Sequence, residues 1–135
     1  MNRVAPWLVL LLLFATACAR VQRAPDRDGD DRRGGGRGRE EVGLASYYAD
    51  VLEGRRTANG ERYRARSATC AHRTHPFGTR LEVQVVETGE KAICRVNDRG
   101  PFVKGRVVDL SRSLADDLDF IDRGVARVRV RPVGR

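Results

Sequence analysis

The chain has 135 residues, of which 33% are charged, and its formal net charge is +8. This length allows one modest hydrophobic core and excludes a large multidomain protein. The excess of positive charge favours an anionic partner, such as a cell-wall glycan or an anionic lipid surface.

The first 17 residues have the pattern of an export signal. Arg3 precedes the apolar run VAPWLVLLLLFATA, which is shorter than the roughly 20 residues of a membrane-spanning helix. Cys18 follows, and "ATAC" resembles the lipobox of bacterial lipoproteins, whose cysteine is lipidated and begins the mature chain. We therefore expect residues 1–17 to be a lipoprotein signal peptide, with ordinary signal cleavage as the alternative. In many enteric bacteria an aspartate directly after the lipidated cysteine marks retention in the inner membrane. This position is Ala19, which favours the outer membrane, facing the periplasm.

Residues 18–42 form the next segment, from the lipidated Cys18 through the run RVQRAPDRDGDDRRGGGRGREE. Such a composition cannot bury enough apolar surface to fold, so it predicts a flexible linker between the lipid and a folded domain. Its arginines and glycines are also typical of RNA-binding segments. An exported chain rarely meets RNA, and we therefore expect no nucleic-acid partner.

Two cysteines, Cys70 and Cys94, remain after Cys18 is set aside. Outside the cytoplasm an even pair of cysteines favours a disulfide, and two buried free thiols are the alternative. A structural zinc site usually takes four Cys or His ligands, whereas His72 and His75 lie near Cys70 alone. We expect neither a metal nor another cofactor.

Residues 43–135 are predicted to form one domain with a charge of about +6, because they hold 18 of the 26 basic and 12 of the 18 acidic residues. Segments with near alternation of apolar and polar residues predict strands. In chain order these are Gly43–Ala49, Leu81–Glu87, Lys91–Asn97, Gly105–Leu110 and Val125–Val133.

The connections refine this prediction. The turn Thr88–Glu90 is short enough for a hairpin with Gly89 at a positive φ. The segment Ser111–Phe120 places Leu114 and Leu118 four residues apart, which predicts one short amphipathic helix with Ser111 as its N-cap and an end near Gly124. The domain is thus mainly β with about one helix, and a closed barrel would leave no exposed strand edges.

Three segments concentrate polar groups among turn residues: GRRTANGE, CAHRTHPFGT and VNDRGPF. Together with GLASYY, GRVVDLS and GVARVRV, in this order from Gly43 to Arg131, they resemble the rare lipoprotein A (RlpA) family. The resemblance implies a six-stranded double-psi β-barrel with lytic transglycosylase activity on the glycan strands of peptidoglycan, and we expect a monomer. A non-catalytic peptidoglycan-binding or expansin-like wall-loosening module is the alternative function.

The implied reaction breaks the β-1,4 bond between N-acetylmuramic acid and N-acetylglucosamine and leaves an anhydro-muramic end. One carboxyl group suffices if it acts first as acid and then as base. Asp98 matches the family's catalytic aspartate and is our first candidate. Glu61 is the second carboxylate, which raises the pKa of Asp98, positions the hydroxyl or is itself the acid. His72 matches the family's histidine and would bond a carboxylate or stabilise developing charge.

Six further residues are candidates for substrate binding. Neighbouring strand residues face opposite ways, so one of the two adjacent tyrosines would meet the sugar and the other the core; Tyr47 stands where the family usually has Trp. Arg99 is expected to face solvent, to pair with an acid or to bind the lactyl carboxylate of muramic acid. The amide and hydroxyl groups would orient the carboxylates or cap turns, whereas Phe77 and Phe102 are expected in the core. The six candidates are Tyr47, Tyr48, Thr57, Asn59, Asn97 and Arg99.

Overall fold

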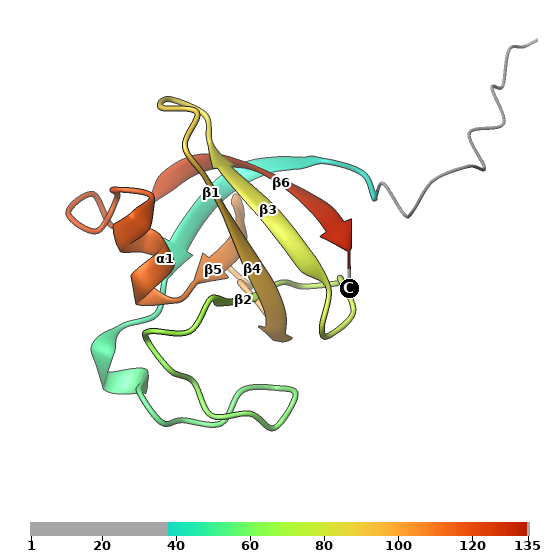
Figure 1. Ribbon diagram of the computed structural model, residues 1–135, viewed down its shortest axis with the longest axis vertical. Coiled ribbons are helices and arrows are strands. Elements are labelled where there is room, and N and C mark those ends of the chain that lie inside the picture. Colours follow the sequence, from blue (N-terminus) through green and yellow to red (C-terminus); the bar gives the residue numbers. More distant parts are fainter. Residues whose placement is uncertain (1–37, 135) are drawn as a thin grey trace, which may run out of the picture. The chain divides into compact units, whose positions relative to one another are not determined.

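The computed structural model describes residues 38–134, which form six strands, one α-helix and one 3-10 helix (Figure 1). The predicted signal peptide, Cys18 and most of the predicted linker lie outside the described residues. No helix within residues 38–134 has the length and apolar character needed to cross a membrane. The elements are β1 (Glu41–Tyr47), η1 (Asp50–Leu52), β2 (Thr69–Ala71), β3 (Arg80–Val85), β4 (Lys91–Asp98), β5 (Arg106–Leu110), α1 (Arg112–Asp117) and β6 (Ala126–Gly134).

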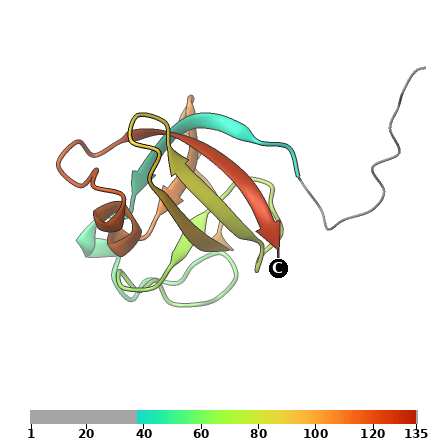
Figure 2. The ribbon, with the colours of Figure 1, turned by 45° about the horizontal axis from the view of Figure 1, so that its top comes forward.

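The strands close into a barrel in the order β1-β5-β2-β4-β3-β6 (Figure 2). Two neighbouring pairs are parallel, β1 with β5 and β2 with β4, and the other four pairs are antiparallel. This mixed order confirms the predicted closed barrel of six strands. Closure pairs every strand on both sides, so the barrel has no free sheet edge.

Alternating apolar side chains fill the barrel. Along β3 the side chains of Leu81, Val83 and Val85 are at most 1% exposed, and β6 contributes Val128 and Val130 in the same way. Each such side chain stabilises the fold by roughly 1.5–3 kcal/mol relative to an exposed position. The polar residues between them face solvent, which is why the alternation in the sequence identified these strands.

The helix α1 is shorter than the sequence suggests. It ends at Asp117, well before the predicted end near Gly124, and Asp119 just beyond it has a φ of 54°. A left-handed residue cannot continue a right-handed helix. Ser111 occupies the N-cap position, but its hydroxyl makes no capping hydrogen bond. Leu114 and Leu118 are buried, as the four-residue spacing predicts.

The strands also differ from expectation at the start of β1 and at β2. β1 begins at Glu41, two residues before the predicted start of the domain. β2, Thr69–Ala71, was not predicted, because its three residues are all buried and show no alternation. The predicted hairpin between β3 and β4 is present, with Gly89 at a φ of 77°.

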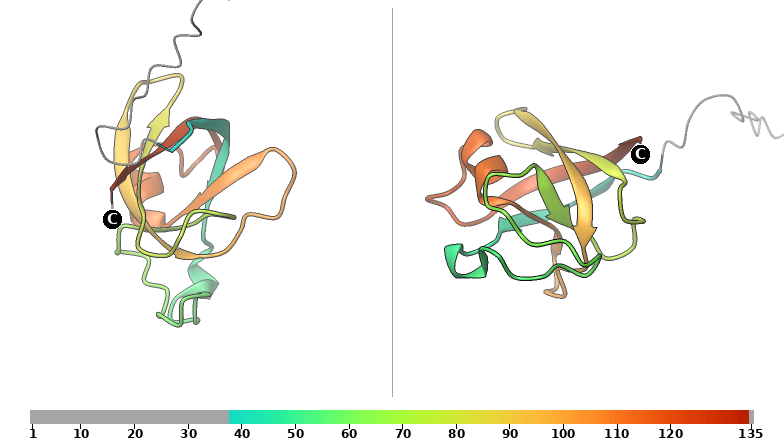
Figure 3. Two further views of the ribbon diagram at one scale, coloured as in Figure 1. Left: turned by 90° about the vertical axis from the view of Figure 1, so that its right-hand side faces the viewer. Right: turned by 60° about the horizontal axis from the view of Figure 1, so that its bottom comes forward.

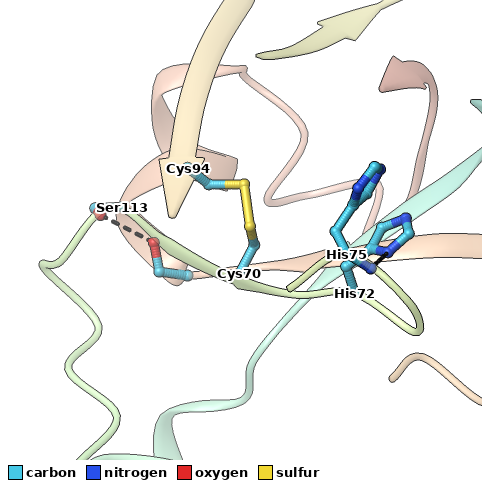
Figure 4. Close-up of a disulfide and its surroundings, with 6 residues drawn as sticks. Cys70, His72, His75, Cys94 and Ser113 are labelled. Atoms are coloured by element: carbon cyan, nitrogen blue, oxygen red, sulfur yellow. Dashed lines mark hydrogen bonds between the residues drawn. A yellow bond between two sulfur atoms is a disulfide. The ribbon is translucent and has the colours of Figure 1, made fainter. Parts of the chain in front are cut away.

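A disulfide joins the parallel neighbours β2 and β4. Cys70 and Cys94 are at most 1% exposed, and their Cα atoms lie 5.7 Å apart (Figure 4). The bridge closes a loop with a sequence separation of 24, which adds on the order of 3 kcal/mol of stability. It fixes β4 four residues before this strand ends at Asp98.

Candidate active site

The carboxylate of Asp98 lies at the end of β4 and is held by three segments of the chain. Its Oδ2 accepts a hydrogen bond from the hydroxyl of Tyr48 at 2.7 Å. Its Oδ1 accepts from the backbone amides of Ala58 at 2.8 Å and Arg99 at 2.9 Å. The two views of Figure 3 show the loop after η1, which carries Ala58, passing the end of β4. Asp98 is half-buried and stays within reach of a bound molecule.

Tyr48 joins this carboxylate to the core. Its ring packs against Tyr63, with 4.6 Å between the ring centroids, and Tyr63 is only 2% exposed. Burial, and then the hydrogen bond to Asp98, raises the pKa of Tyr48 well above its ordinary value. The phenol therefore keeps its proton at any physiological pH. Tyr48 positions the carboxylate instead of offering its ring to a sugar.

Tyr47 faces the other way, as strand alternation requires. Its hydroxyl donates to the carbonyl of Ile121 at 2.9 Å, and its ring meets Phe120 edge-to-face at 5.9 Å. These contacts lie on the side of α1 and the core. The two tyrosines thus face opposite ways, and only Tyr48 contacts Asp98.

The loop Thr57–Glu61 is built to present the Ala58 amide. The Thr57 hydroxyl donates to Oδ1 of Asn59 at 2.8 Å, and the Asn59 amide donates to the Asn97 carbonyl at 3.2 Å. Thr57 is 8% exposed and Asn97 is 2% exposed. Gly60 has a φ of 90°, a conformation that L side chains rarely adopt. Thr57 thus shapes the turn, whereas the side-chain amides of Asn59 and Asn97 both donate to the Glu61 carboxylate.

Glu61 is paired as an ion. Its two oxygens accept from the guanidinium of Arg95 at 2.7 and 2.8 Å, and also from the side-chain amides of Asn59 at 2.9 Å and Asn97 at 3.2 Å. The hydrogen bonds from Arg95, then from Asn59, lower the pKa of Glu61 to about 2. A carboxyl group with this pKa carries no proton near neutral pH, so the geometry favours Asp98 over Glu61 as the acid.

Sequence reasoning missed Arg95. It stands two residues before Asn97 on β4, and residues two apart on a strand share a face. This spacing could have identified Arg95, because it places a guanidinium and an amide side by side, where both can donate to one carboxylate. Nothing in the segment "CRVND" named Glu61, 34 residues earlier, as the partner.

The side chain of His72 is buried and makes no hydrogen bond to the Asp98 carboxylate. It is 1% exposed; its Nδ1 accepts from the amides of Thr74 at 3.2 Å and His75 at 3.1 Å, and its Nε2 lies 3.5 Å from Oε1 of Glu41. Burial, and then the neighbouring His75, lowers the pKa of His72. Figure 4 shows the two imidazoles beside each other. His72 thus holds the turn after β2, and the hydrogen bonds of its ring include neither candidate carboxylate, Glu61 nor Asp98.

Glu41, His72 and His75 bring three metal-ligand atoms within 4.8 Å of one another. The hydrogen bonds around His72 decide what this cluster can do. Because Nδ1 accepts two amide protons, the neutral ring carries its own proton on Nε2. A protonated Nε2 has no lone pair for a metal, and it faces the Glu41 carboxylate instead. The arrangement is therefore a neutral His72 ring whose Nε2–H faces the Glu41 carboxylate.

The side chain of Arg99 contacts the turn after β2. Its guanidinium donates to the carbonyls of His72 at 3.2 Å and His75 at 2.9 Å, and it lies 3.9 Å from the centroid of the Phe77 ring. Both hydrogen bonds come from Nη1, and the side chain pairs with no acid within residues 38–134. The amide of the same residue reaches Asp98, so Arg99 ties the turn to the site.

The aromatic residues near the site also differ from expectation. Phe77 is 39% exposed and Phe102 is 82% exposed, so neither lies in the core. The ring of Phe102 folds towards Gly100, where an added Cβ would lie 3.7 Å from it. Gly100 has a φ of 123°, which lets the chain turn sharply two residues after Asp98.

Comparison with known proteins identifies the family of the chain. Residues 40–130 match the model of the family described as "Lytic transglycolase". A probable endolytic peptidoglycan transglycosylase RlpA from Nostoc sp. is 48% identical over 95 residues, which are 69% of this chain and 26% of that protein. The endolytic peptidoglycan transglycosylase RlpA of Campylobacter jejuni is 42% identical over 68% of this chain and 34% of its own length. The chain thus spans about a quarter to a third of these relatives.

Two solved structures share the fold. The Streptomyces papain inhibitor superimposes with a TM-score of 0.56 at 25% identity, over 70% of this chain and 96% of its own. An expansin from Clavibacter michiganensis gives a TM-score of 0.55 at 19% identity, over 70% of this chain and 50% of that one. The fold is the predicted double-psi β-barrel, and the chain belongs to the lytic transglycolase family, with a barrel of the RlpA type.

Proposed function

We propose that this domain is a lytic transglycosylase that cleaves the bond from N-acetylmuramic acid to N-acetylglucosamine in peptidoglycan glycan strands. The observation that carries the proposal is the Asp98 carboxylate, held at the end of β4 by Tyr48 and two backbone amides. The names of the relatives, which describe endolytic peptidoglycan transglycosylases, supply the substrate and the reaction.

The two oxygens of Asp98 have different surroundings, which suggests how one residue performs both proton transfers. Oδ1 accepts two amide protons, whereas Oδ2 has only the Tyr48 hydroxyl. A hydroxyl can donate or accept, so it tolerates a proton on Oδ2 and then stabilises the carboxylate once that proton has left. Oδ2 is therefore the oxygen that we assign to the substrate.

The reaction then proceeds in two proton transfers. Oδ2 of Asp98 gives its proton to the oxygen of the leaving N-acetylglucosamine as the bond from C1 of muramic acid to that oxygen breaks. The resulting carboxylate takes the proton of the muramic 6-hydroxyl as its oxygen bonds to C1. No water is consumed, and the product ends in a 1,6-anhydro ring. Glu61 and His72 hold the surrounding loops and transfer no proton.

The N-terminal segment completes the proposal. A signal peptide of residues 1–17, a lipid on Cys18 and a flexible tether up to about residue 40 would anchor the domain to a membrane. We place this anchor at the outer membrane with the domain in the periplasm, where glycan strands are accessible. Labelling cells with an alkyne-tagged fatty acid tests the anchor, because a Cys18→Ser variant should incorporate none.

The activity is tested by mass spectrometry of products from purified sacculi. We expect the wild-type domain to release fragments with anhydro-muramic ends, and Asp98→Asn to release none while its thermal unfolding stays close to wild type. Equal product from Asp98→Asn would remove Asp98 from its role.

A non-catalytic wall-binding module is the second candidate, favoured by the expansin fold and by the single available carboxyl group. It predicts that the wild-type domain co-sediments with sacculi but releases no anhydro ends. That result would replace the transglycosylase proposal.

A further inference from the structure

The segment from Gly54 to Arg66, between η1 and β2, carries five arginines and is here named the basic loop. It is drawn in green below the barrel in Figure 1. All five side chains are exposed. They are Arg55, Arg56, Arg62, Arg64 and Arg66.

The acidic residues in and beside the basic loop already have partners. Glu53 lies 3.5 Å from Arg64, Asp50 lies 3.1 Å from Arg112 on α1, and Glu61 is paired with Arg95 on β4. Within residues 38–134, the other four arginines of the loop therefore have no acidic partner.

Two of these four arginines face each other. Arg56 and Arg62 form an antiparallel bridge, so like charges stand directly opposite, which is unfavourable in a strand pair. Each guanidinium donates to a carbonyl of the loop, Arg56 to Gly60 and Arg62 to Gly54, both at 2.9 Å. These bonds orient the two guanidinium groups but leave their charge uncompensated. Gly60 lies in the turn of this hairpin and Gly54 at its open end, so the two guanidinium groups present separate positive charges to an anionic polymer.

The same loop reaches the candidate active site. The Ala58 amide donates to Oδ1 of Asp98, and the Asn59 amide donates to the carbonyl of Asn97. A polymer that brings its scissile bond to Asp98 must therefore pass the basic loop. Arg99, the other guanidinium near the site, is already engaged by two carbonyls and the Phe77 ring.

We infer that the basic loop binds the lactyl carboxylates of muramic acid along the glycan strand. This inference rests on the proposed function, and it assigns to the loop a role that the sequence suggested for Arg99. Guanidinium groups pair well with carboxylates because two parallel N–H donors match the two oxygens. Muramic acid recurs at every second sugar, so one strand can engage several arginines at once.

The test uses peptide-free glycan strands in two forms, one with free lactyl carboxyl groups and one in which they are converted to neutral amides. The variant is Arg55→Gln/Arg66→Gln, since neither side chain has a hydrogen bond or ion pair within residues 38–134. The control is Arg127→Gln/Arg129→Gln, which removes the same charge from β6. A second comparison, Arg55→Lys/Arg66→Lys, keeps the charge at the loop.

We expect the loop variant to raise the KM for native glycan roughly fivefold, the size typical of two exposed charge pairs, with kcat unchanged. The β6 control should change KM less than twofold, and the Lys variant should restore most of the affinity. On amidated glycan the loop variant and the wild type should have equal KM. Raising the salt from about 0.1 M to 1 M shortens the Debye length from about 10 Å to 3 Å, so it should remove the difference on native glycan too.

Equal KM for loop variant and wild type on native glycan would overturn the inference, as would an undiminished difference on amidated glycan. Failure of the proposed function is a separate result, because it is recorded as absence of anhydro ends from wild type. In that case co-sedimentation of the same variants with the two glycans still tests the loop. The inference would also be contradicted if the loop variant lost binding to phosphatidylglycerol vesicles and kept its binding to glycan.

Discussion

Asp98 and Glu61 are two carboxylates supported by the same loop, and the structure treats them in opposite ways. Asp98 accepts from one hydroxyl and two backbone amides, all of them neutral donors. Glu61 accepts from the guanidinium of Arg95 through both oxygens and from two side-chain amides as well. Only one of the two is paired with a cation.

The difference shows what each carboxylate can do. A charge-assisted bidentate pair fixes Glu61 as an ion and fills the acceptor positions of both its oxygens. Asp98 retains an oxygen, Oδ2, whose partner Tyr48 tolerates either protonation state. The ion pair between Glu61 and Arg95 therefore fixes the loop to β4. Asp98 is the group able to exchange a proton with a substrate. The following predictions test this division, from the largest expected effect to the smallest.

Asp98→Asn should lower the rate of anhydro-end formation by roughly a thousandfold, within the range typical of a lost general acid and base. The amide keeps the shape of the side chain, so the melting temperature should change little. The measurement is product release from sacculi, with circular dichroism of the same sample as the folding control. A variant that retains half of the wild-type rate would end the assignment.

Tyr48→Phe should lower the rate roughly ten- to hundredfold, because Oδ2 of Asp98 loses its neutral partner, while unfolding becomes easier by about 1 kcal/mol. Tyr47→Phe is the matched control. It also removes one buried hydroxyl hydrogen bond, the one to Ile121, but on the opposite face of β1. A Tyr47→Phe variant that is as inactive as Tyr48→Phe would show that the effect is only structural.

His72→Ala should destabilise the domain by about 2 kcal/mol, because the amides of Thr74 and His75 lose their acceptor. His72→Asn offers a side-chain oxygen at a similar place and should recover part of this loss. At a temperature where both variants are folded, their rates should stay within about tenfold of wild type. A well-folded His72→Asn variant with no activity would restore a catalytic role to His72.

Glu61→Gln should destabilise the domain at neutral pH by about 1 kcal/mol, since both partners are about 40% exposed and solvent screens the pair. Because the folded-state pKa of Glu61 is lowered from 4.5 to about 2, this stability is present above pH 4.5 and is lost as the pH falls towards 2. Urea unfolding of wild type and variant between pH 2 and 7 measures it. Glu87→Gln, which breaks an exposed pair with Arg123, is the control; a Glu61→Gln effect independent of pH would contradict the ion pair.

The sequence predicted the barrel well because its strands alternate between core and solvent. Runs such as Leu81–Glu87 and Val125–Val133 display this period, whereas the buried segment Thr69–Ala71 does not and was missed. The motifs brought Asp98 and the loop at Glu61 into consideration. Their expected roles came from the resemblance of these motifs to the RlpA family.

Side-chain direction was harder to predict. The motif that contains His72 gave no sign that two local amides would occupy its Nδ1. Arg95 stood in an ordinary alternating strand, and its importance depends on a partner 34 residues away. Such choices depend on which donors the folded chain brings into reach, and a single sequence does not specify them.

The most direct test compares anhydro-end release by Asp98→Asn and Glu61→Gln, side by side on the same sacculi at pH 7 and at a temperature where both are folded. If Asp98 is the only proton-transferring residue, Asp98→Asn falls to the background level, while Glu61→Gln keeps at least about a tenth of the wild-type rate. Two folded variants with equally absent activity would contradict the account, because both carboxylates would then be required for the chemistry.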